Sequence, residues 1–457
     1  MRVPAVASSG DVTASISTCN CPNCGAAFDA DPRFSQWCPA CEWNLGSEPP
    51  GTPRALRRRA RERARAERSH ARMAARSTAG GRWGAEWVAS QVLASLVHLW
   101  TLAVVAGSVW LLLSGSVFFA FLGLVGLGLA FLLRPKLGTR GEDPALVAPE
   151  AAPQLYALAA RIAGELGVRP PARIRVQSGY RTDYTRLGVR QEVELTVGMA
   201  LWTVLSEPER IALLGRELGR GRNRDPRRGL WLRLALDTLD AWYRLLMPDG
   251  GDELMLTRIE RPGQYDMLPT SGVVRQIYAN AQKALIEEVA SRLLRTCALP
   301  VRLVRRALHR LVLSGSQEAE YRADDLGARA GSSRAVTAML DMLFLEESAT
   351  AYLCQQRALV GHGGVARPDD LAQALWNGLA GYLDSVPDIE RERRRRLAAR
   401  QGTAVDAWHP PTHLRVRLQA GRPEQPAAVP AESVDWPAIH AELEDARWRT
   451  AILVLGI

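Results

Sequence analysis

The longest stretch without a charged side chain constrains the fold most. Residues 87–133 contain no Asp, Glu, Lys or Arg. As one helix, these 47 residues would be about 70 Å long, whereas the hydrocarbon core of a bilayer is about 30 Å thick. The Ser-Gly-Ser break at 114–116 leaves two apolar segments, 92–113 and 117–133. The sequence therefore predicts a two-helix transmembrane hairpin over 87–133.

The alternative is a helical hairpin buried in a soluble core, but such cores seldom run so long without a charge. Both flanks of the apolar run are positively charged, with arginines from Arg54 to Arg82 before it and Arg134, Lys136 and Arg140 after it. The positive-inside rule then places both flanks on the same side. We therefore expect a bacterial-type protein of the cell (inner) membrane, with all parts outside the hairpin in the cytoplasm.

The formal net charge of +10 suggests a nucleic acid or an anionic surface as a partner. Ten arginines lie between Arg54 and Arg76, within a basic Arg-rich linker over 47–86. Aromatic residues are not interleaved with these arginines, so a nucleic-acid partner is the least favoured interpretation. We expect the linker to lie against anionic lipid headgroups or to form a solvated basic helix.

Five of the seven cysteines cluster near the N-terminus, after a lead over 1–17 that we expect to be disordered. Cys21-Pro-Asn-Cys24 and Cys38-Pro-Ala-Cys41 are two C-x-x-C turns separated by thirteen residues. Each turn places two sulfurs on one side of a metal ion, and two turns complete the tetrahedral sulfur shell that zinc prefers. The spacing predicts a zinc ribbon over 18–46 with a structural zinc, in which Cys19 is an alternative to Cys21.

After residue 146 the pattern is that of a mainly helical domain with a small sheet. Apolar residues recur with the period of a strand in 173–177 and 191–197. The helical period predicts eight helices, over residues 153–166, 199–205, 207–219, 230–246, 276–313, 332–347, 369–383 and 435–454. Residues 387–407 are expected to form a charged connector.

The segment from Ser206 to Arg220 ends in Arg216-Glu217-Leu-Gly-Arg220. By itself, this R-E-x-x-R pattern is typical of a solvated helix face. Together with Glu209 before it and with Asn223 and Asp225 after it, the segment resembles the active-site helix of HtpX-type peptidases. In those proteins an H-E-L-G-H motif is followed by N-x-D.

Two further blocks follow in the same order as in that family. The block Glu320-Tyr-Arg-Ala-Asp324 resembles the E-[YF]-x-A-D helix that supplies the third zinc ligand. The block from His409 to Arg415 resembles the H-P-x-x-x-R segment that closes the site. Residues 146–420 thus resemble the HtpX and CAAX-prenyl-protease family of membrane zinc metallopeptidases. The resemblance implies an α+β gluzincin-like domain, followed by a C-terminal tail with a helix over 421–457.

The resemblance also implies roles for individual residues. Glu217 matches the general base, Glu320 the third zinc ligand, and His409 the site-closing residue. Asn223, Asp225, Asp324 and Arg415 are the matching supporting residues. The two zinc-binding histidine positions are held by Arg216 and Arg220.

Arginine stays protonated and has only donors, so it cannot ligate zinc. We therefore expect a catalytic zinc to be absent. In place of the metal, we expect Arg216 or Arg220 to form an ion pair with Glu320.

These observations predict a catalytically inactive pseudopeptidase that binds a protein or peptide partner in its groove on the cytoplasmic face. The strand near 191–197 is expected to be an edge strand that adds an extended peptide by β-augmentation. The alternative is an active zinc metalloendopeptidase with non-standard ligands, acting in membrane-protein proteolysis or quality control. The sequence leaves enzymatic activity open.

Overall fold

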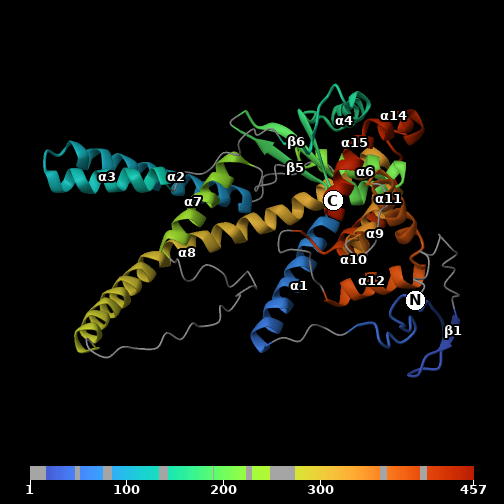
Figure 1. The fold of residues 1–457 in the computed structure, drawn as a ribbon, viewed down its shortest axis with the longest axis horizontal. Coiled ribbons are helices and arrows are strands. Elements are labelled where there is room, and N and C mark those ends of the chain that lie inside the picture. The colour runs from blue at the N-terminus through green and yellow to red at the C-terminus, as the bar shows by residue number, and fades with distance from the viewer. Residues whose placement is uncertain are drawn as a thin grey trace, which may run out of the picture. The chain divides into compact units, whose positions relative to one another are not determined.

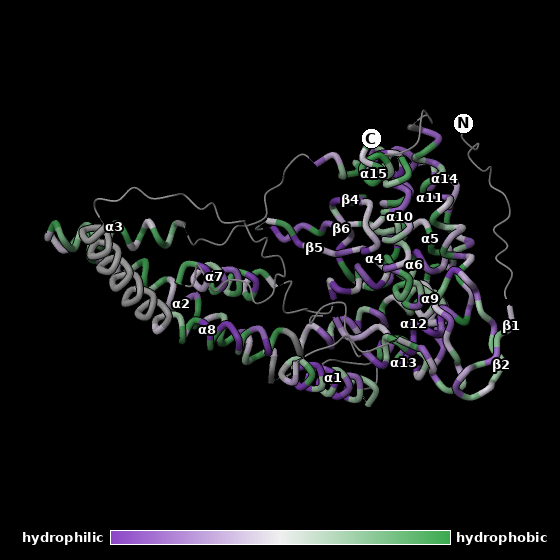
Figure 2. Tube along the Cα trace, turned by 60° about the horizontal axis from the view of Figure 1, so that its bottom comes forward, coloured by the Kyte–Doolittle hydropathy of each residue, from purple (hydrophilic) through white to green (hydrophobic). Residues whose placement is uncertain are grey.

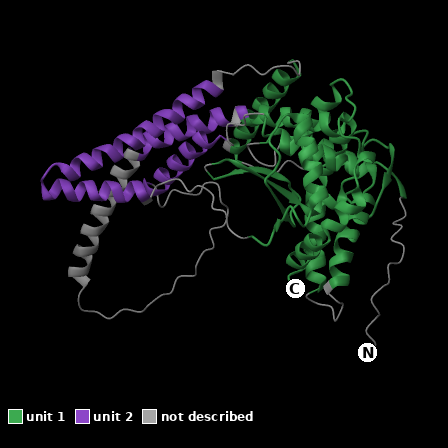
Figure 3. Ribbon diagram, turned by 90° about the horizontal axis from the view of Figure 1, so that it is seen from above, with its two compact units in different colours: residues 1–80, 139–225, 316–457 green, residues 81–138, 226–315 purple. Residues whose placement is uncertain are grey.

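The chain divides into two compact units, described here from a computed structural model (Figure 3). The first unit contains residues 1–80, 139–225 and 316–457, and the second contains residues 81–138 and 226–315. The structure describes residues 17–46, 52–75, 85–132, 143–188, 190–222, 229–246, 273–360, 368–401 and 409–457. The predicted disordered lead therefore lies almost entirely outside the described residues. The described part is mostly helical with two small sheets, as expected from the sequence.

The larger sheet belongs to the first unit and has the strand order β3-β4-β6-β5 (Figure 1). Its strands are β3 (Leu146–Val147), β4 (Arg173–Gln177), β5 (Asp183–Leu187) and β6 (Glu192–Gly198). Strands β4 and β6 are parallel, whereas β3 and β5 pair antiparallel with their neighbours. The expectation that residues 191–197 form an edge strand is wrong, because β6 is hydrogen-bonded on both sides. Strand β5 occupies the edge instead.

The main core of the first unit lies between this sheet and the helices packed on it. The helices that contribute to it are α4 (Pro153–Leu166), α5 (Met199–Val204), α6 (Glu207–Gly219), α9 (Ser333–Met342), α10 (Glu346–Val360) and α11 (Pro368–Asp384). A short 3₁₀ turn, η2 (Leu343–Leu345), joins α9 to α10. The side chains of Trp202 and Trp376 are fully buried at the centre. Alternating Ile and Val residues on β4 and Leu and Val residues on β6 face the same core, which explains their strand periodicity.

The C-terminal segment belongs to the same core. A 3₁₀ turn, η3 (Ala431–Ser433), leads into α14 (Trp436–Glu442) and α15 (Glu444–Leu455). The side chains of Trp436, Ile439 and Ala451 are buried in it. The single helix predicted over 435–454 is divided in two at Leu443, which ends α14 and caps α15.

Three further helices complete the first unit. These are α1 (Pro53–Ala74), α12 (Asp388–Gln401) and α13 (Thr412–Ala420). Within the charged connector predicted over 387–407, residues 388–401 form α12. This helix is stabilised locally because Glu390 pairs with Arg393 and Arg394, three and four residues further on.

The second unit contains α2 (Ala85–Leu113), α3 (Val117–Leu132), α7 (Leu230–Leu246) and the first part of the long helix α8 (Val273–Gly331). Helices α2 and α3 pack closely along Gly123, where an added Cβ would lie 2.5 Å from the carbonyl oxygen of Ser108. Helix α7 packs on α2, and Nε2 of His98 lies 2.9 Å from the Trp231 carbonyl oxygen. The two apolar segments predicted from the sequence therefore form two helices that pack together.

Among the described residues, one helix is long and apolar enough to cross a membrane, over Trp87–Leu113 with a mean hydropathy of 2.0 (Figure 2). The second predicted span, α3, has 16 residues and is about 24 Å long, which is less than a bilayer core requires. The prediction of two spans is thus supported for the first helix alone.

Candidate functional site

The two C-x-x-C turns have the same backbone conformation. In each turn, the carbonyl of the first cysteine accepts a hydrogen bond of 2.9 Å from the residue four positions later, from Gly25 to Cys21 and from Glu42 to Cys38. Gly25 and Glu42 both adopt positive φ angles of 74° and 57°. This left-handed residue lets the chain turn back after the second cysteine, so that both sulfurs of a turn face the same side.

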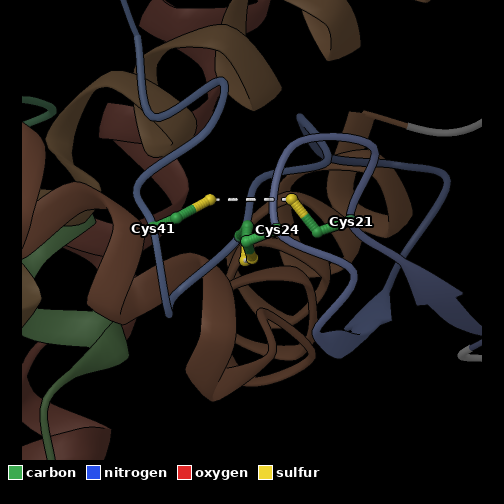
Figure 4. Close-up of side chains that lie close together, drawn as sticks. Cys21, Cys24 and Cys41 are labelled. Atoms are coloured by element: carbon green, nitrogen blue, oxygen red, sulfur yellow. Dashed lines mark hydrogen bonds between the residues drawn. The ribbon is translucent and has the colours of Figure 1, made fainter.

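The four sulfurs converge on one point. The Sγ atoms of Cys21 and Cys41 are 3.6 Å apart and face each other in Figure 4, and those of Cys24 and Cys38 are 3.7 Å apart. All four lie within 4.8 Å of one another. A tetrahedral site with Zn–S bonds of about 2.3 Å places its sulfurs about 3.8 Å apart. The four cysteines can therefore bind a metal ion such as zinc, whereas Cys19 lies outside the cluster.

Hydrogen bonds from the first turn reach two of these sulfurs, those of Cys21 and Cys41. The backbone N–H of Asn23 lies 3.4 Å from Cys21 Sγ, and its side-chain Nδ2 lies 3.5 Å from Cys41 Sγ. The hydrogen bond from Asn23, together with one from the Trp43 backbone, lowers the pKa of Cys41 to about 6. A cysteine with a lowered pKa is more readily available as the thiolate that a metal requires.

The ribbon, which includes the hairpin β1 (Ser17–Asn20) and β2 (Ala27–Ala30), is docked on α12. The Trp37 side chain is only 1% exposed, and its indole N–H donates to the carbonyl of Ile389 at 3.1 Å. The Arg396 guanidinium covers the same indole ring at 5.3 Å. Arg33 donates to the carbonyl of Ser385 at 3.0 Å, just before α12 begins. The buried side of the ribbon therefore packs against the rest of the first unit.

The arginines of α12 are engaged by protein groups. Arg393 and Arg394 pair with the buried Glu390 at 2.6 and 2.7 Å. Arg395 pairs with Asp341 at 2.9 Å. These paired arginines thus stabilise α12 and hold it against its neighbours.

A second cluster, which we call the arginine–carboxylate cluster, lies where α6 crosses α8. Helix α6 begins with a capping box, in which the Ser206 N–H donates to Glu209 Oε2 at 3.0 Å. Further along, α6 approaches α8 with glycines on both sides of the contact. An added Cβ would lie 2.7 Å from Leu326 Cβ at Gly219 and 2.6 Å from the Ala212 nitrogen at Gly331. Only a side chain of one hydrogen allows this close crossing.

The crossing brings Arg216 and Arg220 of α6 against Glu320 of α8. Arg216 Nη2 donates to Glu320 Oε2 at 2.6 Å, and Arg220 Nη2 donates to the same oxygen at 2.8 Å. The ion pair that we expected from the sequence is therefore confirmed, and both arginines take part in it. Glu217 lies between them, hydrogen-bonded to Arg216 Nη1 and 2.9 Å from Arg220 Nη1.

Asp324 connects this pair of arginines to a third one. Its Oδ1 accepts from Arg216 Nε at 2.9 Å. Arg415 of α13 binds the same carboxylate through two hydrogen bonds, of 2.8 Å from Nε and 2.6 Å from Nη2. His409 Nε2 lies 3.8 Å from Glu320 Oε1 at the border of the cluster. Asp183 of β5 accepts from Arg220 Nη1 at 3.1 Å and is largely exposed.

The buried charges of the cluster balance. Three guanidiniums face three carboxylates, and each of these six residues is less than 10% exposed. The members are Arg216, Arg220, Arg415, Glu217, Glu320 and Asp324. Such a group is stable only when every charge is paired, because an unpaired charge in the interior is strongly destabilising.

The two glutamates of the cluster titrate differently. Burial acts to raise the pKa of Glu320, but the charges of Arg220 and Arg216 outweigh it and hold that pKa well below its ordinary value. For Glu217, burial outweighs the same two charges, so its pKa is raised. Glu320 is therefore the carboxylate that depends most on the two arginines.

The cluster has no free carboxylate pair for a metal, because Glu217 and Glu320 are both held by guanidiniums. Within the described ranges, the only group of His, Cys, Asp and Glu side chains arranged to hold a metal ion is the cysteine cluster. Asn223 and Asp225 lie outside the described residues. Sequence analysis missed Asp183, since no motif marks it and it reaches the cluster only through the pairing of β5 with β6.

No protein-family model matches the chain, and neither a curated protein nor a solved structure matches it.

We predict that chelation of the ribbon metal loosens α12. A metal bound by the four cysteines would order the turn next to Trp37, so its removal would release the contacts of Trp37 with Ile389 and Arg396. Hydrogen exchange of the full chain, followed by mass spectrometry, should become faster in residues 388–401. Helix α2 serves as the internal control and should not change. Unchanged exchange in α12 after verified metal loss would rule out this coupling.

We predict that Glu320→Ala lowers the free energy of unfolding by about 3–5 kcal/mol, because it leaves two buried guanidiniums without their shared partner. The matched control is Glu62→Ala, which removes an exposed ion pair with Arg58 on α1. That control should cost about 0.5 kcal/mol or less. Denaturant titrations of the full chain measure both values, and equal losses would contradict the role assigned to Glu320.

The depressed pKa of Glu320 predicts a pH dependence with a definite sign. The ionised carboxylate is favoured in the folded state, so its stabilisation is complete above the ordinary value of 4.5 and is lost as the pH falls through the lower folded value. Glu320→Gln mimics the protonated form at every pH. The difference in unfolding free energy between the wild type and this variant should shrink below pH 4.5. A constant difference from pH 7 to pH 3 would refute this assignment.

Proposed function

We propose that this chain is a membrane-anchored pseudopeptidase on the scaffold of the HtpX and CAAX-prenyl-protease family, which has lost hydrolysis and binds extended polypeptide. The proposal is carried by one observation, the double ion pair of Arg216 and Arg220 with Glu320. In the family these three positions hold a zinc ion.

Charge arithmetic supports this interpretation. Two guanidiniums carry the same total charge as one zinc ion, so they neutralise Glu217, Glu320 and their surroundings as the metal would. Arginine differs from the metal in one decisive respect, since it cannot lower the pKa of a bound water or polarise a carbonyl. Glu217 then has no metal-bound water to deprotonate. A site of this kind keeps its shape and loses its chemistry.

Under this proposal the chain holds one structural zinc, bound by the ribbon cysteines, and no catalytic zinc. Four thiolates close the coordination shell and leave no position for a substrate. Because Trp37 packs on α12, the ribbon stabilises that part of the first unit. The ribbon then has a structural role.

The membrane anchor in this proposal is the pair α2 and α3. Large apolar side chains on both helices are exposed, among them Trp100, Leu113, Phe118 and Phe131. A continuous apolar surface of this kind marks contact with a membrane or another partner. With positive flanks on both sides of the pair, the residues before α2 and after α3 lie on the cytoplasmic side of an inner membrane in this proposal.

The binding edge of the proposed groove is β5. Strand β5 stands at one end of the strand order of the described sheet, and an extended peptide can add to such an edge by β-augmentation. Asp183 begins this strand and is tied to Arg220, and Arg186 donates to the Gly221 carbonyl at 2.9 Å. The edge is therefore coupled to the end of α6, next to the arginine–carboxylate cluster.

Restoring the histidines tests the family assignment. We predict that Arg216→His combined with Arg220→His adds about one zinc per chain, because a neutral histidine pair on α6 and Glu320 together form a zinc ligand set. Elemental mass spectrometry of the full chain should give about one zinc for the wild type and about two for the double variant. The single variant Arg216→His is the control and should bind no second ion.

Two outcomes would overturn the proposal. A chain with Arg216 and Arg220 unchanged that keeps zinc after Cys24→Ser and Cys41→Ser would favour the active metalloendopeptidase with non-standard ligands. A folded double-histidine variant without a second zinc would show that α6 and α8 do not form a peptidase-type metal site.

A further inference from the structure

The arginines of α1 divide into two groups with different surroundings. One face of this helix is anchored on the first unit, with Ala66, Ser69 and Met73 buried. Ala66 and Met73 pack in one apolar cluster with Tyr321 and Leu414. Tyr321 directly follows Glu320 in the sequence, and Leu414 directly precedes Arg415. Helix α1 is therefore packed against the elements that carry the arginine–carboxylate cluster.

The inward group of charged residues supports this anchoring. Arg63 Nη2 donates to the Gln401 carbonyl at 3.2 Å, at the end of α12. Glu67 pairs with Arg417 of α13 at 2.6 Å. Arg72 lies 3.7 Å from Glu318 of α8. These contacts use the protein itself as the partner of α1.

The outward group forms a separate surface, which we call the arginine stripe. It consists of Arg57, Arg61, Arg65 and Arg68, all of which are exposed. At 100° per residue, the spacing of four, four and three positions places them within about 80° of the helix circumference. The stripe runs along the helix for about 17 Å. Its mean direction differs from that of Ala66 and Met73 by roughly a third of a turn, whereas the buried Ser69 lies at its border, so packing does not cover the four side chains. Arg72, one turn beyond Arg68, lies in the same direction but is paired with Glu318.

We propose that the arginine stripe binds the headgroups of anionic phospholipids and so holds the first unit at the membrane surface. A straight row of guanidiniums on one face of an anchored helix can reach a flat anionic surface simultaneously, with each guanidinium binding phosphate through paired hydrogen bonds. The apolar helix α2 begins at Ala85, eleven residues after the end of α1, so the stripe directly precedes the membrane anchor in the sequence. This inference rests on the membrane association proposed above but not on the loss of hydrolysis.

Nucleic acid fits this surface less well. The stripe contains no aromatic side chain on which a base could stack. A lipid surface requires only the outermost guanidiniums, which is the arrangement found here.

The test compares three full-length proteins in detergent. The stripe variant carries Arg57→Gln, Arg61→Gln, Arg65→Gln and Arg68→Gln. The charge-matched control carries the same change at four exposed arginines elsewhere in the first unit, namely Arg169, Arg190, Arg329 and Arg334. Each protein is equilibrated with equal amounts of phosphatidylglycerol and phosphatidylcholine and repurified, and the retained lipids are quantified by mass spectrometry.

The wild type and the charge-matched control should retain phosphatidylglycerol in excess. The stripe variant should lose this excess by roughly fivefold or more, since each arginine at an anionic surface contributes about a factor of five. Basic residues that flank α2 and α3 are identical in all three proteins, so the lipid that they retain does not affect the comparison. Because the stripe is exposed, the melting temperatures should agree; if the fourfold variant fails to fold, Arg61→Gln with Arg65→Gln repeats the comparison.

Equal enrichment in the wild type and the stripe variant would overturn the proposal. An equal loss of phosphatidylglycerol enrichment in the charge-matched control would also overturn it, because the loss would then follow from net charge alone. Binding of a labelled DNA duplex that the stripe variant alone loses, without lipid enrichment in the wild type, would assign the stripe to nucleic acid. A protein that needs no detergent would refute the membrane anchor separately, and vesicles of the same two lipids would then test the stripe by itself.

Discussion

The first unit depends on one interaction, the buried balance of three guanidiniums against three carboxylates where α6 crosses α8. Transfer of these charges from water is costly, and the cost is offset only because each guanidinium meets carboxylates at hydrogen-bond distance. Lysine would not serve here, since a single ammonium cannot span Glu217, Glu320 and Asp324 as the planar fork of Arg216 does. The glycines at the crossing are the backbone condition for this geometry, because they allow the two helices to approach closely enough.

Paired arginines also stabilise the periphery of the first unit, where the ribbon packs on α12. The ribbon is too small for a core of its own, and its largest apolar side chain, Trp37, is buried by α12 instead. Arginines of α12 then bridge from the ribbon to η2 and α10, through contacts of Arg396 with Pro39 and of Arg394 with the Phe344 carbonyl and Ser348. The docking of Trp37 and a row of paired arginines thus take the place of an extended hydrophobic core, next to four cysteines that can bind a metal ion.

Helix α1 and the helix pair α2 and α3 have different surface chemistry. The exposed surface of α2 and α3 is apolar, whereas α1 presents arginines. The two helices are separated by only ten residues in the sequence. Such a change over so short a distance fits the proposal of a protein at a bilayer surface, where hydrocarbon and phosphate lie within the same interval.

The sequence by itself determined the elements whose signal is local. The apolar period of 153–166 and of 207–219 predicted α4 and α6, the two C-x-x-C turns predicted the sulfur cluster, and the charge-free run predicted a helix long enough for a membrane. The chemistry of arginine was sufficient to predict an ion pair with Glu320.

Only the tertiary structure decided the rest. It placed β5 at the edge in place of β6, turned the expected connector into α12, and brought Asp183 to Arg220 and Trp37 to Ile389. The last of these contacts joins residues 352 positions apart. The physical reason is that pairing partners, strand neighbours and docking surfaces depend on which distant segments meet, and no local period or spacing records that meeting.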